Sequence, residues 1–243
     1  MAERVPSSQQ PPNDASQPFR EQWQVYQKVV DNNYLAHREV RGVLRQQLVE
    51  AVGRPFRFLD LACGDASMTV AALEGTPVHA YEGIDISAAA LAMAKRTVAS
   101  LSCPARLEEH DFVATMRERT EPADVVYVGL SLHHLPAPEA KRDFLRSVRA
   151  VIGEQGLLLI FEPTNLEHES RPAYLARYDT FIHTTWRALT PAEQNILWTH
   201  VHTCDYPESP STWTQLGHDA GFTQVEDLFT DAAKMHSVFA YRP

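Results

Sequence analysis

The sequence predicts an α/β fold, in which an open and mostly parallel sheet of seven strands carries helices on both faces. Two observations indicate this fold. Strand-like and helix-like segments alternate between residues 56 and 162, and such alternation is typical of parallel sheets. The segment Phe56 to Ser67 also joins a short apolar strand, through a tight turn of small residues, to an alanine-rich helix. Open α/β sheets bind nucleotides at turns of this kind.

The elements follow from the spacing of the apolar residues. Strands are predicted at 56–62, 78–86, 105–112, 123–131, 155–162, 224–231 and 235–242. Helices are predicted at 66–74, 88–100, 137–152 and near 210–220, where Gly221 ends the last one. Residues 19–52 are predicted to form one or two further helices that lie outside the sheet.

The interval 163–209 is too long for a plain connection between a strand and a helix. Within it, Thr190 to Glu193 forms a capping-box pattern with proline at the first helical position, which predicts a helix from Pro191 to about Thr203. An earlier helix is predicted from Pro172 to Trp186. Because ligands bind beyond the carboxyl ends of parallel strands, we interpret 163–209 as a substrate lid that works with the N-terminal helices.

Composition fits one domain of ordinary globular character. The chain has 243 residues, of which 44% are hydrophobic and 22% charged, and we assign 19–243 to a single domain. Residues 1–18 are polar and proline-rich, so they are predicted to be a disordered tail. The net charge of −9 argues against a nucleic-acid partner, and no apolar stretch approaches the roughly 20 residues of a membrane span. Three cysteines without metal or disulfide spacing suit the cytoplasm.

The ends of the first two strands predict a nucleoside site. The first strand ends on Asp60 and turns through Ala62, Cys63 and Gly64, whose small side chains let the backbone approach a ligand. The second strand ends on Asp85, where a carboxylate can accept hydrogen bonds from ribose hydroxyls. A dinucleotide fingerprint would need three glycines here, and two of the three positions are not glycine. The turn therefore favours a ligand without a pyrophosphate.

This turn resembles the first motif of the class I S-adenosylmethionine-dependent methyltransferases, D-x-x-C-G-x-G, with Ala66 in place of the last glycine. The resemblance covers about residues 55–163 and the end of the chain. It continues in Asp111-Phe112, which follow the third strand, and in Ser131 to Pro136, which follow the fourth. It implies a Rossmann-like sheet whose last strand is antiparallel and lies beside the fifth.

The resemblance also implies which residues hold S-adenosylmethionine and its product S-adenosylhomocysteine. Asp60 and the turn 62–64 would hold the methionine end, Asp85 the ribose, and Asp111 and Phe112 the adenine. From the N-terminal helices, Tyr34 and Arg38 would contribute, with Arg38 pairing with the methionine carboxylate. The full set of predicted cofactor residues is Tyr34, Arg38, Asp60, Ala62, Cys63, Gly64, Asp85, Ile86, Asp111, Phe112, Leu130 and His134.

His133 and Glu162 are the predicted catalytic residues. Methyl transfer is an in-line displacement, so the protein mainly aligns the nucleophile and removes its proton where it has one. In small-molecule O-methyltransferases that the chain resembles, a histidine of this segment is the base, sometimes beside an acid after the fifth strand, where Glu162 stands. A purely structural or positioning role for His133 is the alternative. For His134, helix capping or a cofactor contact is favoured.

The predicted function is methyl transfer to a small molecule, with an oxygen acceptor (hydroxyl or carboxylate) first and nitrogen second. An acidic acceptor could meet cationic lid side chains, namely Arg171, Arg177, His183 and Arg187. An NAD-dependent oxidoreductase and a non-catalytic S-adenosylmethionine-binding module are the alternatives from other classes. The identity of the acceptor and the oligomeric state are not specified by the sequence.

No metal is predicted. His200, His202 and Cys204 alternate like zinc ligands on a strand, but the predicted helix turns His202 away from the other two and no fourth ligand is evident. The carboxylate cluster of magnesium-dependent catechol-type enzymes is replaced after the fourth strand by His133 and His134.

Overall fold

A computed structural model describes the backbone of residues 17–243, and the side chains from residue 24 onward except that of Ala51. The predicted disordered tail falls at residues 1–18. Its first 16 residues lie outside the described part of the chain, and residues 17–18 belong to the first helix, α1 (Gln17–Asp31).

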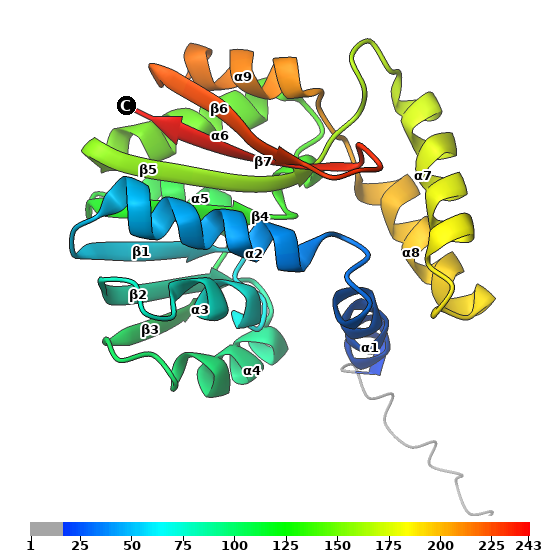
Figure 1. Ribbon diagram of the computed structural model, residues 1–243, viewed down its shortest axis with the longest axis horizontal. Coiled ribbons are helices and arrows are strands. Elements are labelled where there is room, and N and C mark those ends of the chain that lie inside the picture. The colour runs from blue at the N-terminus through cyan, green and yellow to red at the C-terminus, as the bar shows by residue number, and fades with distance from the viewer. Residues whose placement is uncertain (1–16) are drawn as a thin grey trace, which may run out of the picture.

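The described chain forms one seven-stranded sheet, and the predicted architecture is confirmed (Figure 1). The spatial order is β3-β2-β1-β4-β5-β7-β6. All neighbours from β3 to β5 are parallel, whereas β7 runs antiparallel to both β5 and β6, as the family resemblance implied. The strands are β1 (Phe56–Leu61), β2 (Val78–Asp85), β3 (Ala105–Glu109), β4 (Ala123–Gly129), β5 (Ile152–Pro163), β6 (Gln224–Thr230) and β7 (His236–Arg242).

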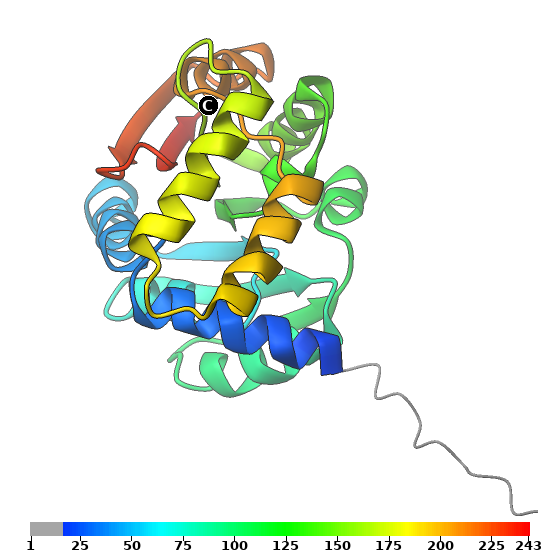
Figure 2. The same ribbon diagram turned by 90° about the vertical axis from the view of Figure 1, so that its right-hand side faces the viewer.

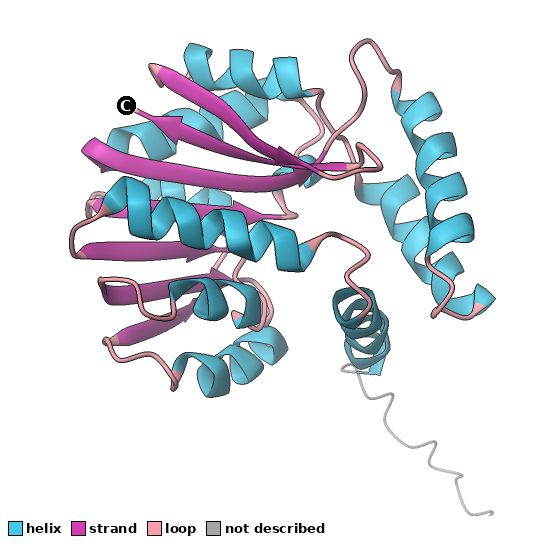
Figure 3. Ribbon diagram, viewed as in Figure 1, coloured by secondary structure: helices cyan, strands magenta, loops and turns pink. Residues whose placement is uncertain are grey.

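Helices cover both faces of the sheet (Figure 3). One face carries α2 (His37–Gln46) with a π-helical extension (Gln47–Val52), α3 (Ser67–Leu73) and α4 (Ala88–Val98). The other carries α5 (Phe112–Glu118), α6 (Pro138–Val151) and α9 (Pro210–Asp219). Since successive strand residues point to opposite faces, each face has its own apolar core. In β1, Phe56 and Phe58 pack in one core, and Leu59 and Leu61 in the other.

Three helices stand beyond the carboxyl ends of the parallel strands. These are α1, α7 (Arg171–Thr185) and α8 (Pro191–Cys204), and α1 passes across the end of the α7–α8 pair (Figure 2). The predicted capping box is present: Thr190 and Glu193 each bond the other's backbone N–H. We refer to residues 163–209 as the lid.

An ion pair and a ring stack are among the contacts that join the N-terminal segment to the lid. Lys28 of α1 pairs with Glu193 at 2.6 Å, and the ring of Tyr34 stacks on Trp186 with 5.3 Å between centroids. The lid aromatics Tyr174, Tyr178 and Trp186 are buried, and they belong to the same apolar core as α1, α2 and one face of the sheet. No helix in the described residues is long and apolar enough to cross a membrane.

The third strand is shorter than predicted, and a helix that was not predicted follows it. The strand ends at Glu109, and α5 begins at Phe112. Asp111 is the N-cap of this helix, because its Oδ1 accepts a hydrogen bond of 2.8 Å from the backbone N–H of Ala114.

Candidate functional site

A cavity of about 890 Å³ opens at the carboxyl ends of the parallel strands, between α1, α2 and the turn that follows β1. We call it the main cavity. Every predicted cofactor residue except Tyr34 lines it: Arg38, Asp60, Ala62, Cys63, Gly64, Asp85, Ile86, Asp111, Phe112, Leu130 and His134. The structure therefore brings residues from five separate segments to one cavity.

The turn after β1 bends sharply enough that three residues adopt left-handed backbone angles. Ala62, Gly64 and Ala66 have φ of 53°, 55° and 59°. This region suits glycine and costs other L-residues roughly 1–2 kcal/mol each. The conformation persists at Ala66, where the related motif has glycine, so the substitution leaves the shape of the turn in place while storing strain in it.

Asp85 fixes the turn from the neighbouring strand. Its Oδ2 accepts from the backbone N–H of Gly64 and its Oδ1 from that of Ser87, both at 2.8 Å. Each carboxylate oxygen has a second lone pair, so the group can still accept hydrogen bonds from a ligand in the main cavity.

Asp60 is almost completely buried at the end of β1. Its Oδ2 accepts hydrogen bonds of 2.6 Å from the hydroxyls of Thr69 and Tyr81, whereas its Oδ1 has no partner. Burial raises the pKa of Asp60 to about 7, against the opposing effect of the two hydroxyls. An unpartnered carboxylate oxygen at the edge of the main cavity is a site for a cationic or donor group.

The N-terminal predictions have different outcomes. Arg38 lines the main cavity, and its Nη2 donates to the carbonyl of Asp31 at 3.2 Å. Tyr34 lies elsewhere: its hydroxyl accepts from the backbone N–H of Ala188 at 2.9 Å, and its ring stacks on Trp186. Tyr34 therefore links the N-terminal segment to the lid, and its contact with the cofactor stays a prediction.

Sequence reasoning missed two basic residues of the main cavity, Arg41 and His110. The signal for Arg41 was its spacing from Arg38, because residues three apart share a face of α2. His110 directly precedes Asp111, and its Nδ1 lies 2.9 Å from the hydroxyl of Thr115.

The predicted pair of His133 and Glu162 is present and deeply buried. Nδ1 of His133 lies 2.6 Å from Oε2 of Glu162. The Glu162 carboxylate also accepts from the backbone N–H groups of Ser131, Leu132 and His133, at 2.9–3.2 Å. Burial alone would lower the pKa of His133, but the adjacent carboxylate of Glu162 outweighs it and raises that pKa.

The other nitrogen of His133, Nε2, faces a second carboxylate, that of Asp205, at 3.5 Å. Both ring nitrogens thus face acids, and His133 does not line the main cavity. Of the adjacent pair His133 and His134, it is His134 that lines the main cavity, and its side chain is 40% exposed. Its pKa is lowered to about 3 by desolvation and by His133 and His200. His133 instead lines a smaller cavity that adjoins the main one, and its role as a base stays a prediction.

A smaller cavity of about 150 Å³ adjoins the main one beneath the lid. Tyr26, Leu130, His134 and His200 line both, and the aromatic rings of Tyr178 and Trp186 line the smaller one only. His200 projects from α8, and His202 instead stacks on Trp198, so the prediction that the helix separates these two histidines is confirmed.

The cationic lid residues do not face either cavity. Arg177 forms an ion pair with Glu169 at 2.7 Å. Arg171 donates to the carbonyls of His202 and Asp205 at 2.7 Å and lies over the ring of Tyr206. His183 and Arg187 are absent from both cavity linings. The expected binding of an acidic acceptor through these side chains is therefore not supported by their positions.

Comparison with known proteins places the fold. A family model described as a methyltransferase domain matches residues 58–156, from β1 to β5. This match and the order of the strands support the resemblance to the class I S-adenosylmethionine-dependent methyltransferases. No curated protein matches the sequence.

Solved structures similar to this chain agree on the architecture. An O-methyltransferase family protein from Burkholderia thailandensis has a TM-score of 0.64 at 16% identity, over 93% of this chain and 62% of that one. A possible exported protein from Bordetella parapertussis has a TM-score of 0.62 at 19% identity, over 84% of this chain and 67% of that one. The structure described as the DhpI complex with S-adenosylhomocysteine has a TM-score of 0.60 at 14% identity, over 94% of this chain and 95% of that one. At these identities the likeness establishes the fold, and the first of the three proteins is considerably longer than this chain.

Proposed function

We propose that this methyltransferase domain transfers a methyl group from S-adenosylmethionine to an oxygen of a small molecule. The observation that carries the proposal is the pair of adjoining cavities. The main cavity collects the acidic side chains of successive strand ends, and the smaller, aromatic one lies next to it under the lid. Such a division suits one cofactor and one small acceptor.

The residues fit the cofactor. Asp60 has an unpartnered buried oxygen, Oδ1, which suits the ammonium group of the methionine end, and Arg38 suits its carboxylate. Asp85 would accept from the ribose hydroxyls. Asp111 and Phe112 would hold the adenine, although one oxygen of Asp111 already caps α5. When bound, the cofactor supplies a methyl group activated by a sulfonium.

Oxygen is the preferred acceptor atom for two reasons. His133 stands where a histidine is the base in the small-molecule O-methyltransferases that the chain resembles, and the Burkholderia thailandensis protein of similar fold is described as an O-methyltransferase family member. Nitrogen remains the second candidate. The net charge of −9 favours a small acceptor over nucleic acid, because phosphate binding relies on clustered Lys and Arg. Location in the cytoplasm stays a prediction.

The test is a methyl-donor consumption assay over a panel of phenols, alcohols, carboxylic acids and amines. We expect S-adenosylhomocysteine to form with an oxygen acceptor and not with its O-methylated counterpart, which serves as the matched control. Turnover confined to amines would replace oxygen by nitrogen. Cofactor binding without turnover on any class would indicate a non-catalytic binding module.

A further inference from the structure

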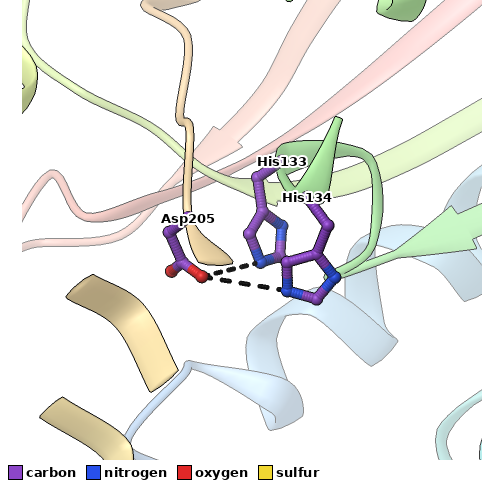
Figure 4. A group of neighbouring side chains, drawn as sticks. All are labelled: His133, His134 and Asp205. Atoms are coloured by element: carbon purple, nitrogen blue, oxygen red, sulfur yellow. Dashed lines mark ion pairs between the residues drawn. The ribbon is translucent and has the colours of Figure 1, made fainter. Parts of the chain in front are cut away.

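Two histidines and one carboxylate converge where the lid meets the sheet. Nε2 of His133 and Nε2 of His134 lie 3.5 Å and 3.8 Å from the same oxygen, Oδ1 of Asp205 (Figure 4). The three donor atoms all lie within 4.8 Å of one another. The histidines form a 3₁₀ turn after β4 (Leu132–His134), and Asp205 directly follows α8, so the lid completes the cluster.

The oxygen at the centre of this cluster is buried without a hydrogen-bond partner. Asp205 is 4% exposed, and its Oδ1 is accessible neither to solvent nor to a donor in hydrogen-bonding geometry. Leaving a carboxylate oxygen in this state is costly, and the cost is removed when a cation binds to it.

The local charge points the same way. Two carboxylates, those of Glu162 and Asp205, flank His133, and both are buried. The nearby ammonium group of Lys141 is already paired, because it donates to Glu208 and to the carbonyl of Tyr206 at 2.6 Å. A divalent cation between neutral imidazoles would balance the two negative charges.

The ring of His133 is oriented as metal ligands are. Metal-binding histidines commonly donate their other ring N–H to a carboxylate, which fixes the tautomer. Nδ1 of His133 does this to Glu162 at 2.6 Å, leaving Nε2 directed at Asp205. The separations of 3.5 Å and 3.8 Å are close to the value of about 3.3 Å between neighbouring ligands of a tetrahedral ion with bonds near 2.0 Å.

We propose that His133, His134 and Asp205 bind a divalent transition metal ion of the zinc type. Two imidazoles with one carboxylate favour such ions over Mg²⁺ or Ca²⁺, which prefer all-oxygen sites. His200 is available as a fourth ligand from α8, with Nε2 at 3.9 Å from Oδ1 of Asp205.

The site borders both cavities, since His134 lines each of them. When His133, His134 and Asp205 are the only protein ligands, as in catalytic zinc sites, the fourth position, beside His200, stays open toward the space proposed for the acceptor. The ion would bind an acceptor oxygen there and favour its deprotonated form. This last role rests on the proposed function, whereas the metal site itself does not.

The test uses the full chain without an affinity tag, stripped with a chelator and titrated with Co²⁺. Calorimetry gives the affinity, and the visible absorption of Co²⁺ reports its ligands. We expect one ion per chain, with affinity at least tenfold lower in Asp205→Asn and in His134→Ala. His183→Ala is the matched control, because His183 is an exposed lid histidine that also pairs with a carboxylate, with its Nδ1 3.2 Å from Oδ1 of Asp179. The Co²⁺ affinity of this variant should equal that of the native chain.

Absence of saturable Co²⁺ and Zn²⁺ binding by the native chain would overturn the inference. So would binding that both variants leave unchanged, since exposed histidines would then be the ligands. Circular dichroism melting checks that His134→Ala, in which a half-exposed ring is removed, remains folded. Titration of the same samples with S-adenosylhomocysteine separates the two proposals: cofactor binding without metal binding rejects only the metal site, and the reverse result rejects only the proposed function.

Discussion

Two buried carboxylates at strand ends differ in how they are satisfied, and the difference separates their roles. Glu162 receives three backbone N–H groups and the ring of His133, so its charge is fully solvated by the protein. Asp60 receives two hydroxyls on one oxygen and none on the other. We therefore infer that Glu162 stabilises the turn that holds His133, whereas Asp60 keeps one oxygen free to bind a ligand.

The raised pKa of Asp60, about 7, predicts a pH dependence of cofactor affinity. Below pH 7 the free protein holds Asp60 protonated, and an ammonium group of the ligand requires it ionised, so binding must release a proton. Affinity for S-adenosylhomocysteine should rise about tenfold from pH 6 to pH 8 and then level off. Calorimetry in matched buffers measures it.

Asp60→Asn keeps the acceptor for Thr69 and Tyr81 but cannot ionise, so its affinity should be weaker and lack this slope. Asp143→Asn, an exposed carboxylate on α6, is the control and should retain the slope. A slope preserved in Asp60→Asn would assign the titration to another group.

Most of the cofactor residues could be predicted because they lie at strand ends, and the strand ends of a parallel sheet share one edge. The approach of Asp205 and His200 to His133 could not be predicted from the sequence. They come from the lid, some 70 residues after His133 in the sequence, and only the docking of α8 brings them together. The position of Tyr34 away from the main cavity could not be predicted either, because its partner, Trp186, also lies in the lid.

Among the elements, α5 shows how a site residue can also be a structural one. Asp111 was predicted as the end of a strand that binds adenine, yet its Oδ1 caps α5. The short strand β3 and this helix meet within two residues, so the apolar pattern of either is too brief to separate them.

Replacing Asp111 by alanine should lower the free energy of unfolding by about 1 kcal/mol, because the first turn of α5 loses its cap. Asp111→Asn should stay within a few tenths of a kcal/mol of the native value, since asparagine caps helices equally well. Urea unfolding followed by circular dichroism measures both. Equal stability of the alanine and native chains would mean that the cap contributes nothing here.

The lid and the N-terminal segment share apolar packing that lies outside the sheet, and few polar contacts reinforce it, which predicts that these helices open more readily than the sheet. The half-exposed pair of Lys28 and Glu193 is worth at most about 1 kcal/mol, and the Tyr34–Trp186 stack a similar amount. Without ligand, amide hydrogen exchange in α1, α7 and α8 should be faster than in the central strands β1 and β4. S-adenosylhomocysteine should slow it in these helices.

The strands β1 and β4 provide the internal control, since their exchange should change little on ligand binding. Equal protection of the lid helices with and without S-adenosylhomocysteine would contradict closure and indicate a fixed cap. The extent of the lid was predicted from its length and capping box. Dense aromatic residues more often fill a core than line a pocket, and Tyr174, Tyr178 and Trp186 are buried accordingly.

For the whole molecule, the order of elements determined the topology. Alternation of strands and helices requires right-handed crossovers, which place five parallel strands side by side and gather their carboxyl ends at one edge. The antiparallel β7 beside β5 came from family resemblance, because no feature of its sequence specifies a direction. The consequence is the main cavity, where the carboxylates at the ends of β1 and β2 face the loop before α5.

The central claim is that the main cavity binds S-adenosylmethionine, and calorimetric titration with S-adenosylhomocysteine tests it most directly. The native chain should bind one molecule, and NAD should not bind measurably. Asp85→Ala should bind at least tenfold more weakly, because ribose hydrogen bonds to a carboxylate contribute about 1.5–3 kcal/mol each. Binding of NAD in place of S-adenosylhomocysteine, or unchanged affinity in a folded Asp85→Ala chain, would contradict the account.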